Sequence, residues 1–277
     1  MKRKIKADKP TAIKQPVSRK AYENQLAQAC EFMIRQITQR FQNQAIGKIN
    51  KSTEAKFADA QVGNFAVVFL NLAKKTEKKL LSQFDDDRID DLAFRIMGRM
   101  DRETRNEFYG AIENVVGISS KELIATEGLK FTTNALILET SQWIKKLRDE
   151  TIEMYTANSL RIMAQGGDLD EVINELIEMG GKRVDHARFT AINQIQNFNA
   201  VSQKIRAENL GITKAIWRTS QDERVRRCHE VRDGKEFDLK EGLYSSCDNQ
   251  SIIPGVDYQC RCVAEYIIPS DEDQDSE

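Results

Sequence analysis

Apolar residues recur every three or four positions along most of the first 210 residues, which is the spacing of amphipathic helices. Two such stripes are Leu26, Cys30, Met33, Ile37 and Phe41, and Ala58, Val62, Phe65, Phe69, Leu72, Thr76 and Leu80. No proline stands between Pro16 and Pro254. Because proline breaks helix interiors, this gap also favours long helices. The pattern predicts a mainly α protein.

The same periodicity continues beyond these two stripes. It predicts further helices over residues 88–116, 120–164, 169–179 and 183–210. Ser119 with Glu122 has the spacing of a capping box for the second of these. We expect the pairs Gly166-Gly167 and Gly180-Gly181 to end helices, and Gly211 to cap the last one.

The pattern changes after Gly211. Residues 212–219 and 262–268 are rich in β-branched and aromatic residues and predict strands, and Asp233-Gly234 is a tight-turn signal. Residues 238–258 carry few large apolar groups, so a bound ion is one way to order this part. The chain is therefore expected to end in a small α+β module, with zinc holding it together.

Charge is distributed unevenly, although the whole chain has a formal net charge of only −1. Residues 1–20 hold eight basic residues and one acid, whereas residues 270–277 hold five acids and no base. We expect both ends to be solvated tails. The predicted organisation is a basic disordered tail (1–20), a helical region (21–180), a C-terminal module (181–268) and an acidic tail (269–277).

Membrane insertion and secretion are not expected. The longest apolar runs, such as residues 65–70, fall far below the roughly 18 residues that span a bilayer. The charged N-terminus is not followed by an apolar segment and a small-residue cleavage site. We therefore expect the newly synthesised protein to be in the cytoplasm, without a membrane partner.

Four of the five cysteines and one histidine cluster near the C-terminus. Thiolate and imidazole are ligands that a structural zinc ion prefers. The preferred set is His229, Cys247, Cys260 and Cys262. Cys228 is the substitute, because adjacent residues such as Cys228 and His229 cannot both point inward. The spacing is irregular for zinc, since standard sites use ligand pairs two to four residues apart.

Other interpretations of this cluster remain open. In one, the thiols are free and pack as small hydrophobic groups, with His229 bonded to a carboxylate. In another, the site is a zinc module that binds DNA. A third is a metal-dependent hydrolase that uses Asp222, Glu223, Glu230 or Asp233 as a general base. Four protein ligands would close the site to substrate, so we expect no enzymatic activity and no small-molecule substrate.

Several short motifs follow one another in a fixed order over residues 183–266. They are a helix, Gly211-Ile212, the strand around Trp217, the segment from Asp222 through Arg226 to His229, the turn Asp233-Gly234, Pro254-Gly255, and Cys260-Arg261-Cys262. This order resembles the phage Mu F-like minor head protein family. The resemblance implies that some members carry a cysteine pair at the positions of Arg226 and His229, an arrangement similar to a zinc ribbon.

The resemblance implies a structural virion protein. Members of the family are minor components of tailed bacteriophage heads, associated with the portal vertex and needed for head morphogenesis, with suggested roles in DNA packaging or ejection. The implied location is the virion head near the portal, and the host cytoplasm during assembly. The implied partners are the portal protein and the major capsid or scaffolding protein.

Two parts of the chain are candidate contact regions. The amphipathic helices of residues 20–165 have the spacing to pack against portal, scaffold or coat helices, or to form one intramolecular bundle. Lys2, Arg3, Lys4 and Lys6 lead a basic segment suited to neutralising phosphates of packaged double-stranded DNA. The alternative is a tail that only adds solubility.

Overall fold

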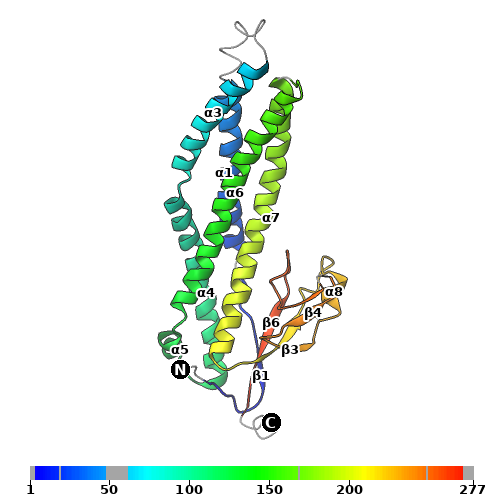
Figure 1. Ribbon diagram of the computed structural model, residues 1–277. Coiled ribbons are helices and arrows are strands. Elements are labelled where there is room, and N and C mark those ends of the chain that lie inside the picture. The colour runs from blue at the N-terminus through cyan, green and yellow to red at the C-terminus, as the bar shows by residue number, and fades with distance from the viewer. Residues whose placement is uncertain (1–3, 19, 48–61, 168, 248, 271–277) are drawn as a thin grey trace. The chain divides into compact units, whose positions relative to one another are not determined.

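The computed structural model describes residues 4–18, 20–47, 62–167, 169–247 and 249–270 (Figure 1). The chain is mainly helical and carries a small strand-containing region near its C-terminus, as expected. It forms two compact units, each assembled from separate stretches. Unit 1 comprises Met1–Asn24, Phe94–Ile137 and Ile192–Glu277, and unit 2 comprises Gln25–Ala93 and Leu138–Ala191.

Helices, most of them long, supply most of the structure. They are α1 (Lys20–Arg40), the short π-helix η1 (Phe41–Ile46), α3 (Val62–Gln83), α4 (Asp86–Val116), α5 (Ser120–Thr126), α6 (Lys130–Ala164), α7 (Leu169–Asn209) and the single-turn α8 (Arg227–Glu230). Within the described residues, no helix has a stretch long and apolar enough to cross a bilayer. Ala58, at the start of the second predicted stripe, lies outside these residues.

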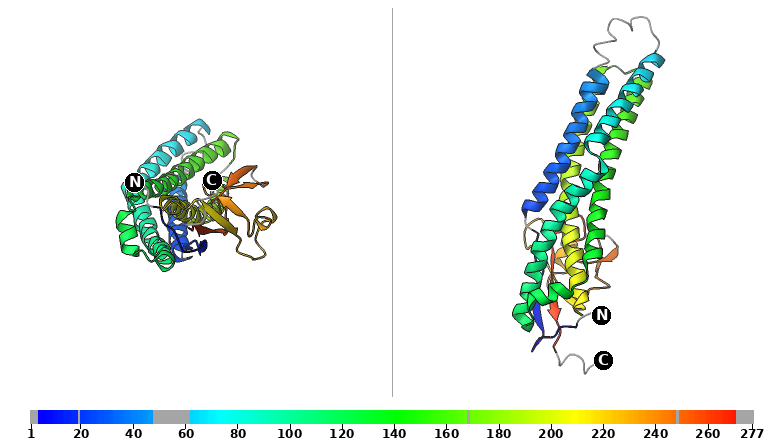
Figure 2. Two further views of the ribbon diagram at one scale, coloured as in Figure 1. Left: turned by 90° about the horizontal axis from the view of Figure 1, so that it is seen from below. Right: turned by 90° about the vertical axis from the view of Figure 1, so that its left-hand side faces the viewer.

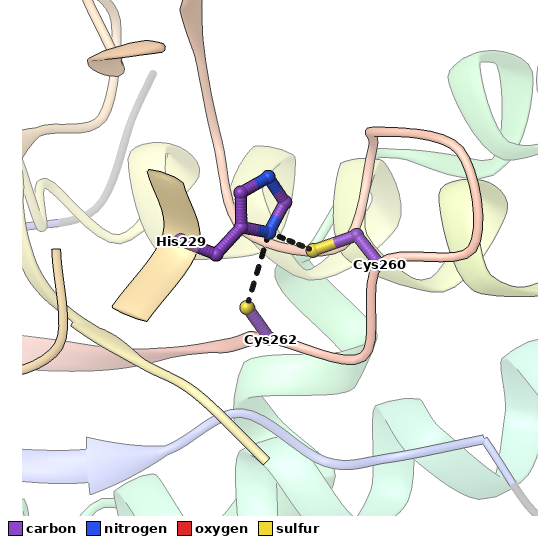
Figure 3. A group of neighbouring side chains, drawn as sticks. All are labelled: His229, Cys260 and Cys262. Carbon is purple, nitrogen blue, oxygen red and sulfur yellow. Dashed lines mark hydrogen bonds between the residues drawn. The ribbon is translucent and has the colours of Figure 1, made fainter. Parts of the chain in front are cut away.

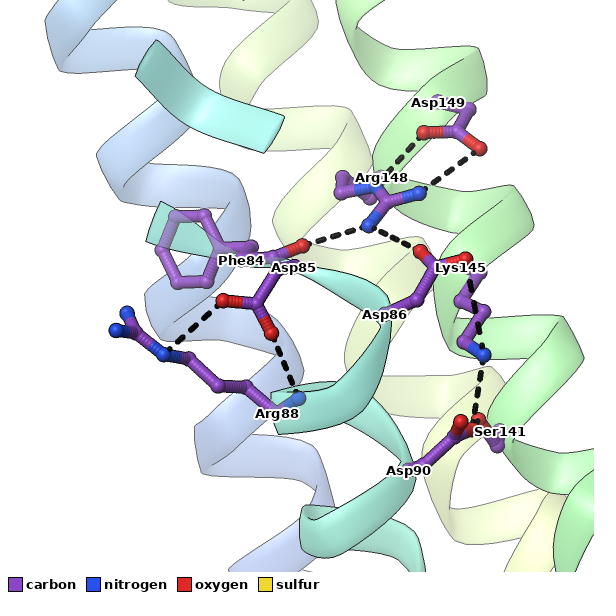
Figure 4. A network of polar contacts seen from close by, with 9 residues as sticks. All are labelled: Phe84, Asp85, Asp86, Arg88, Asp90, Ser141, Lys145, Arg148 and Asp149. Carbon is purple, nitrogen blue, oxygen red and sulfur yellow. Dashed lines mark hydrogen bonds and ion pairs between the residues drawn. The ribbon is translucent and has the colours of Figure 1, made fainter. Parts of the chain in front are cut away.

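Unit 2 is a helical bundle with a buried apolar interior and a polar seam. Leu26, Ile37 and Phe69 are fully buried, as their helical spacing predicts. Along the seam, Arg148 of α6 donates to the carbonyl of Phe84 and to Asp86 at the start of α4 (Figure 4). Because α6 and α4 are joined by charged hydrogen bonds here, the register of the two helices is defined.

The pair Gly180-Gly181 does not end a helix, so the boundary predicted there is wrong. Helix α7 runs through both glycines without interruption. A Cβ on Gly180 would stand 2.9 Å from the Thr38 methyl and 3.3 Å from the Tyr155 hydroxyl. Gly180 therefore allows the close approach of three helices rather than a turn.

Other predicted boundaries are confirmed or corrected by glycine geometry. Gly166 and Gly211 have φ of +82° and +80° and end α6 and α7 as expected. Gly128, with φ of +67°, breaks the helix predicted over residues 120–164 into α5 and α6. Ser119 precedes α5, but its side chain makes no capping bond; instead the Ser120 amide donates to Glu113.

Unit 1 contains a four-stranded sheet in the order β1-β6-β2-β3. Its strands are β1 (Thr11–Lys14), β2 (Lys214–Arg218), β3 (Glu236–Asp238) and β6 (Val263–Ile268), all with antiparallel neighbours. A separate hairpin pairs β4 (Leu243–Ser245) with β5 (Gln250–Ile252). In Figure 2 the blue β1 lies beside the red β6. The strands predicted at 212–219 and 262–268 are confirmed.

The expectation of a disordered tail over residues 1–20 is wrong for the described part, residues 4–18. Thr11–Lys14 pair with the last strand, and the Ile5 amide donates to the Leu210 carbonyl at 3.1 Å. Ile5, Ala7 and Ile13 are buried, alternating with exposed lysines. The charge of this segment obscured a period-two pattern that belongs to an edge strand. The predicted acidic tail lies mostly outside the described residues, from residue 271 onward.

The core of unit 1 packs this sheet against helical segments. Trp217, Tyr266 and Phe108 are fully buried, and the rings of Phe108 and Tyr266 meet edge to face at 5.7 Å. Arg206 is also buried in unit 1, where it donates to both Glu127 and Asp101. The sheet therefore rests on an apolar core with one enclosed ionic cluster beside it.

Candidate metal centre

His229, Cys260 and Cys262 converge at one point in unit 1 (Figure 3). His229 projects from α8, and the two cysteines lie in the loop that leads into β6. Nδ1 of His229 is 3.4 Å from Sγ of Cys260 and 3.6 Å from Sγ of Cys262. The three residues are only 2%, 3% and 5% exposed. We call this group the His-Cys-Cys cluster.

Asp257 fixes the orientation of the His229 ring. Its Oδ2 atom lies 3.0 Å from Nε2 of His229 and 2.6 Å from a guanidinium nitrogen of Arg226. A carboxylate accepts hydrogen bonds, so Nε2 carries the ring proton and Nδ1 presents its lone pair to the two sulfurs. This carboxylate–histidine arrangement is the usual support of a histidine that binds a metal.

The loop that carries both cysteines is held at several points. Arg261, between the two cysteines, forms an ion pair with Asp222 at 2.5 Å. The Cys260 amide donates to the Asp257 carbonyl at 2.9 Å, and the Gln259 amide donates to the side chain of Asn193 on α7 at 2.9 Å. These contacts fix the position of both thiols before any ligand binds.

Trp217 forms one wall of the cluster. It is fully buried, and its ring meets the His229 ring edge to face at 5.5 Å. The Arg232 guanidinium lies 5.0 Å above the indole, in the geometry of a cation–π contact. The buried indole therefore packs directly against the imidazole of the cluster.

The turn Asp233-Gly234 connects α8 to the sheet. Asp233 accepts a hydrogen bond from the Thr219 amide at 2.8 Å, and this bond holds the pKa of Asp233 below its usual value. The Gly234 amide donates to the Trp217 carbonyl at 2.8 Å, with φ of +75° at the glycine. The tight turn thereby sets the distance between His229 and the strand beneath it.

The two thiols of the cluster are electrostatically unequal. A hydrogen bond from the Cys262 thiol lowers the pKa of Cys260, and the same contact raises the pKa of Cys262. One sulfur therefore loses its proton more readily than the other. A bound metal would favour the thiolate form of both, because metal ligation requires deprotonated sulfur.

The donor set and its spacing fit zinc. At tetrahedral angles, the usual Zn–N and Zn–S bond lengths place the nitrogen and each sulfur about 3.6 Å apart. The observed separations of 3.4 and 3.6 Å match this value without rearrangement. Three ligands come from the described residues, so a fourth position is available to water or to another donor.

Cys247 is not part of the cluster, so its expected role as a ligand is wrong in this structure. It forms a disulfide with Cys228, whose Cα atom is 6.1 Å away. This separation is ordinary for a disulfide. The substitute ligand Cys228 is thereby also engaged. The side chain next to His229 does point elsewhere, as expected for adjacent residues, and it meets Cys247 there.

The residues chosen for their motif all support the cluster. Trp217 packs on it, Arg226 holds Asp257, Asp222 holds Arg261, and Asp233 with Gly234 forms the turn. Sequence reasoning missed Asp257 and Arg261, although Arg261 stands inside the Cys-Arg-Cys signal. Of the basic residues proposed to bind DNA, Lys2 and Arg3 lie outside the described residues, while Lys4 and Lys6 are exposed.

A comparison with known protein families finds a match that covers the His-Cys-Cys cluster. Residues 139–265 match the sequence profile of the family described as Phage Mu protein F like protein. Residues 139–265 are similar to the phage Mu F-like family. The matched Mu F-like region contains the whole cluster and begins earlier than the resemblance expected at residue 183. This match supports the interpretation of the protein as a phage head morphogenesis protein.

One curated relative is an uncharacterized protein from Haemophilus influenzae, strain ATCC 51907 / DSM 11121 / KW20 / Rd. It is 27% identical over 209 residues, which cover 74% of this chain and 46% of the relative. The chain therefore spans less than half the length of that protein. No solved structure matches the chain.

Proposed function

We propose that this protein is a minor component of a bacteriophage head, located near the portal vertex and acting in head morphogenesis. The observation that carries the proposal is the match of residues 139–265 to the Mu F-like family. That region includes Trp217, Asp222, Arg226, Asp233 and Gly234, whose contacts build the cluster. The proposed partners are the portal protein and the major capsid or scaffolding protein, with a further role in DNA packaging or ejection.

We further propose that the His-Cys-Cys cluster binds a structural zinc ion. When bound, zinc would link α8 to the loop before β6 through coordination bonds to His229, Cys260 and Cys262. The burial of all three ligands supports a structural rather than a catalytic site, since a catalytic zinc needs substrate access. Asp222 and Asp233, two candidate bases, are already committed to Arg261 and to the Thr219 amide. The proposal therefore includes no enzymatic activity.

Quantitative mass spectrometry of purified phage particles tests the head assignment. The chain is counted per portal subunit, and element analysis of the isolated protein measures zinc alongside. A reproducible low number of copies per particle, retained after particles are washed in high salt, is the expected result. Absence from both finished particles and assembly intermediates would contradict the proposal. Host cytoplasmic proteins counted in the same particles provide the background level.

A further inference from the structure

A hollow of about 720 Å³ opens in unit 2, far along the chain from the cysteine cluster. Its lining comes from the end of α1, one face of α3 and the start of α4. Among the described residues that line it, five are cations and none is an acid. We call it the basic hollow. Its cations are Arg40, Lys75, Lys78, Lys79 and Arg88.

The lysines that α3 contributes to the basic hollow are not neutralised by acids of the same helix. Glu77 is the only acid of α3. At 100° per residue, Glu77 lies on the face of α3 opposite to the one that Lys75 and Lys79 share. The lysine side chains of α3 are exposed. This face is therefore a strip of cations without interleaved acids, unlike a usual solvated helix face with paired charges.

The neighbouring carboxylates are also occupied. Figure 4 shows Asp86 and Asp90 engaged with Arg148 and Lys145 of α6. Asp85 pairs with Arg88 at 3.2 Å, so one of the five cations is partly compensated. Among the described residues, the structure assigns no ion pair to the other four. Four positive charges therefore line the hollow without an ion-pair partner in the part of the chain that the structure describes.

The arrangement selects for a ligand with several separated negative charges. Lys75 and Lys79 are one helical turn, about 6 Å, apart, and the arginines come from two other helices. One small anion cannot contact all of them. None of the described residues that line the hollow is aromatic. Single-stranded nucleic acids are bound largely by stacking on aromatic rings, and protein partners usually meet aromatic and apolar anchors. A duplex backbone requires neither.

We propose that the basic hollow binds the phosphate backbone of double-stranded nucleic acid without sequence preference. This inference goes beyond the proposed structural role, because it concerns a different unit and does not depend on the cluster or on zinc. Lysines act as point charges on phosphates and carry no base readout. Binding driven by displaced counterions weakens steeply as salt increases.

Fluorescence anisotropy with a fluorescein-labelled duplex of about 20 base pairs tests the proposal on the full chain. With four unpaired cations, log Kobs should fall against log[NaCl] with a slope of about −4. Combined K75E, K78E and K79E should weaken binding more than tenfold at 50 mM NaCl. The slope of this variant should be shallower by about 3.

A matched control changes the same net charge elsewhere. Lys121, Lys130 and Lys240 are exposed, and the combined K121E, K130E and K240E variant should bind the duplex within about threefold of wild type. Unchanged melting curves for both variants exclude unfolding as the cause. Equal loss in the two variants, or no loss in the first, would overturn the proposal.

A labelled peptide with the sequence of residues 269–277 tests the competing class of ligand, an acidic protein segment. Weaker binding than the duplex supports a nucleic-acid site. Tighter binding that is lost in the α3 variant would assign the hollow to a protein instead. Because copy number in particles is measured separately, failure here leaves the head assignment intact, and the reverse also holds.

Discussion

Oδ2 of Asp257 lies 3.0 Å from Nε2 of His229, and this contact determines which ring nitrogen faces the two thiols. Without it, the imidazole has no fixed tautomer and can present an N–H to the sulfurs, which weakens metal binding. Asp257 is itself anchored by Arg226. Arg226, a residue of the sequence motif, thus acts on the cluster indirectly: it holds Asp257, and Asp257 holds His229.

Asp257→Ala should lower zinc affinity by about 10–100-fold, the usual effect of removing the carboxylate that supports a ligand histidine. Competition with a chromophoric chelator measures the affinity. Glu241→Ala is the control, because Glu241 is an exposed acid of the same module. Wild-type affinity in the Asp257 variant would contradict the role given to this contact.

Cys260→Ser or Cys262→Ser should remove zinc from the protein and lower the free energy of unfolding by about 2–5 kcal/mol, because a structural ligand is lost. Cys247→Ser should retain zinc, since Cys247 is bonded to Cys228. Under oxidising conditions this variant also loses stability, by about 3 kcal/mol, through the broken cross-link. Element analysis separates the two cases: zinc loss in the Cys247 variant would restore the four-ligand site expected from sequence.

Gly180→Ala should lower the free energy of unfolding by about 1–3 kcal/mol, because the added methyl group meets Thr38 and Tyr155. Gly181→Ala is the matched control, since a Cβ there has nothing within 4 Å. It should raise stability by up to about 1 kcal/mol through helix propensity. Urea unfolding of both variants gives the values. A stabilising effect at both positions would contradict the close packing at Gly180.

Arg206→Met should lower the free energy of unfolding by about 3–5 kcal/mol, because it leaves Asp101 and Glu127 buried without their main cation. Adding Asp101→Asn and Glu127→Gln should restore at least half of this loss, since no unpaired charge then remains. Chemical denaturation measures all three proteins. A loss below about 1 kcal/mol in the single variant would show that the cluster is not enclosed in solution.

The stability of unit 2 should depend on pH through Asp90. Hydrogen bonds from Lys145 and from Ser141 hold the pKa of Asp90 below its usual value. A lowered pKa means that this stabilisation is present above the unfolded pKa of about 3.9 and is lost as pH falls through the folded pKa. The carboxylate is partly exposed, so the contribution at pH 7 is below about 1 kcal/mol.

Asp90→Asn measures this contribution. The difference in unfolding free energy between wild type and the variant should be largest near pH 7 and should shrink below about pH 4. Asp91→Asn, at an exposed neighbouring position, is the control for the loss of one negative charge. A difference that stays constant from pH 7 to pH 3 would contradict the assignment.

Sequence patterns predicted the elements whose signals are local. The helical stripes, the strand around Trp217 and the turn at Gly234 each depend on neighbouring residues, and all three are present. The role of Gly180 depends on Thr38 and the position of Ile5 on Leu210, and each of these partners is more than 100 residues away. A glycine pair looks the same in sequence whether it ends a helix or admits another helix, so only packing separates the two cases.

The residues of the candidate site also fall into two groups: those with a recognisable sequence signal and those placed only by the fold. His229, Cys260 and Cys262 were identifiable because few residue types bind zinc and these three stand close together in the chain. Asp257 has no such signature, since a carboxylate that orients a histidine is set by the fold and not by a fixed spacing. Cys247 was assigned by chemistry alone, which does not distinguish a ligand from half of a disulfide.

The pairing of β1 with β6 has a consequence for the order in which the protein folds. Thr11 lies opposite Ile268, so the sheet joins residues that are more than 250 positions apart in the sequence. Contacts between such distant residues form slowly, because a very long loop must close first. The ribosome must therefore have synthesised the chain as far as β6 before the Thr11–Lys14 segment can take its place in the sheet. Until then, the Thr11–Lys14 segment has no β6 strand to pair with, and its unpaired backbone is prone to pair with another chain.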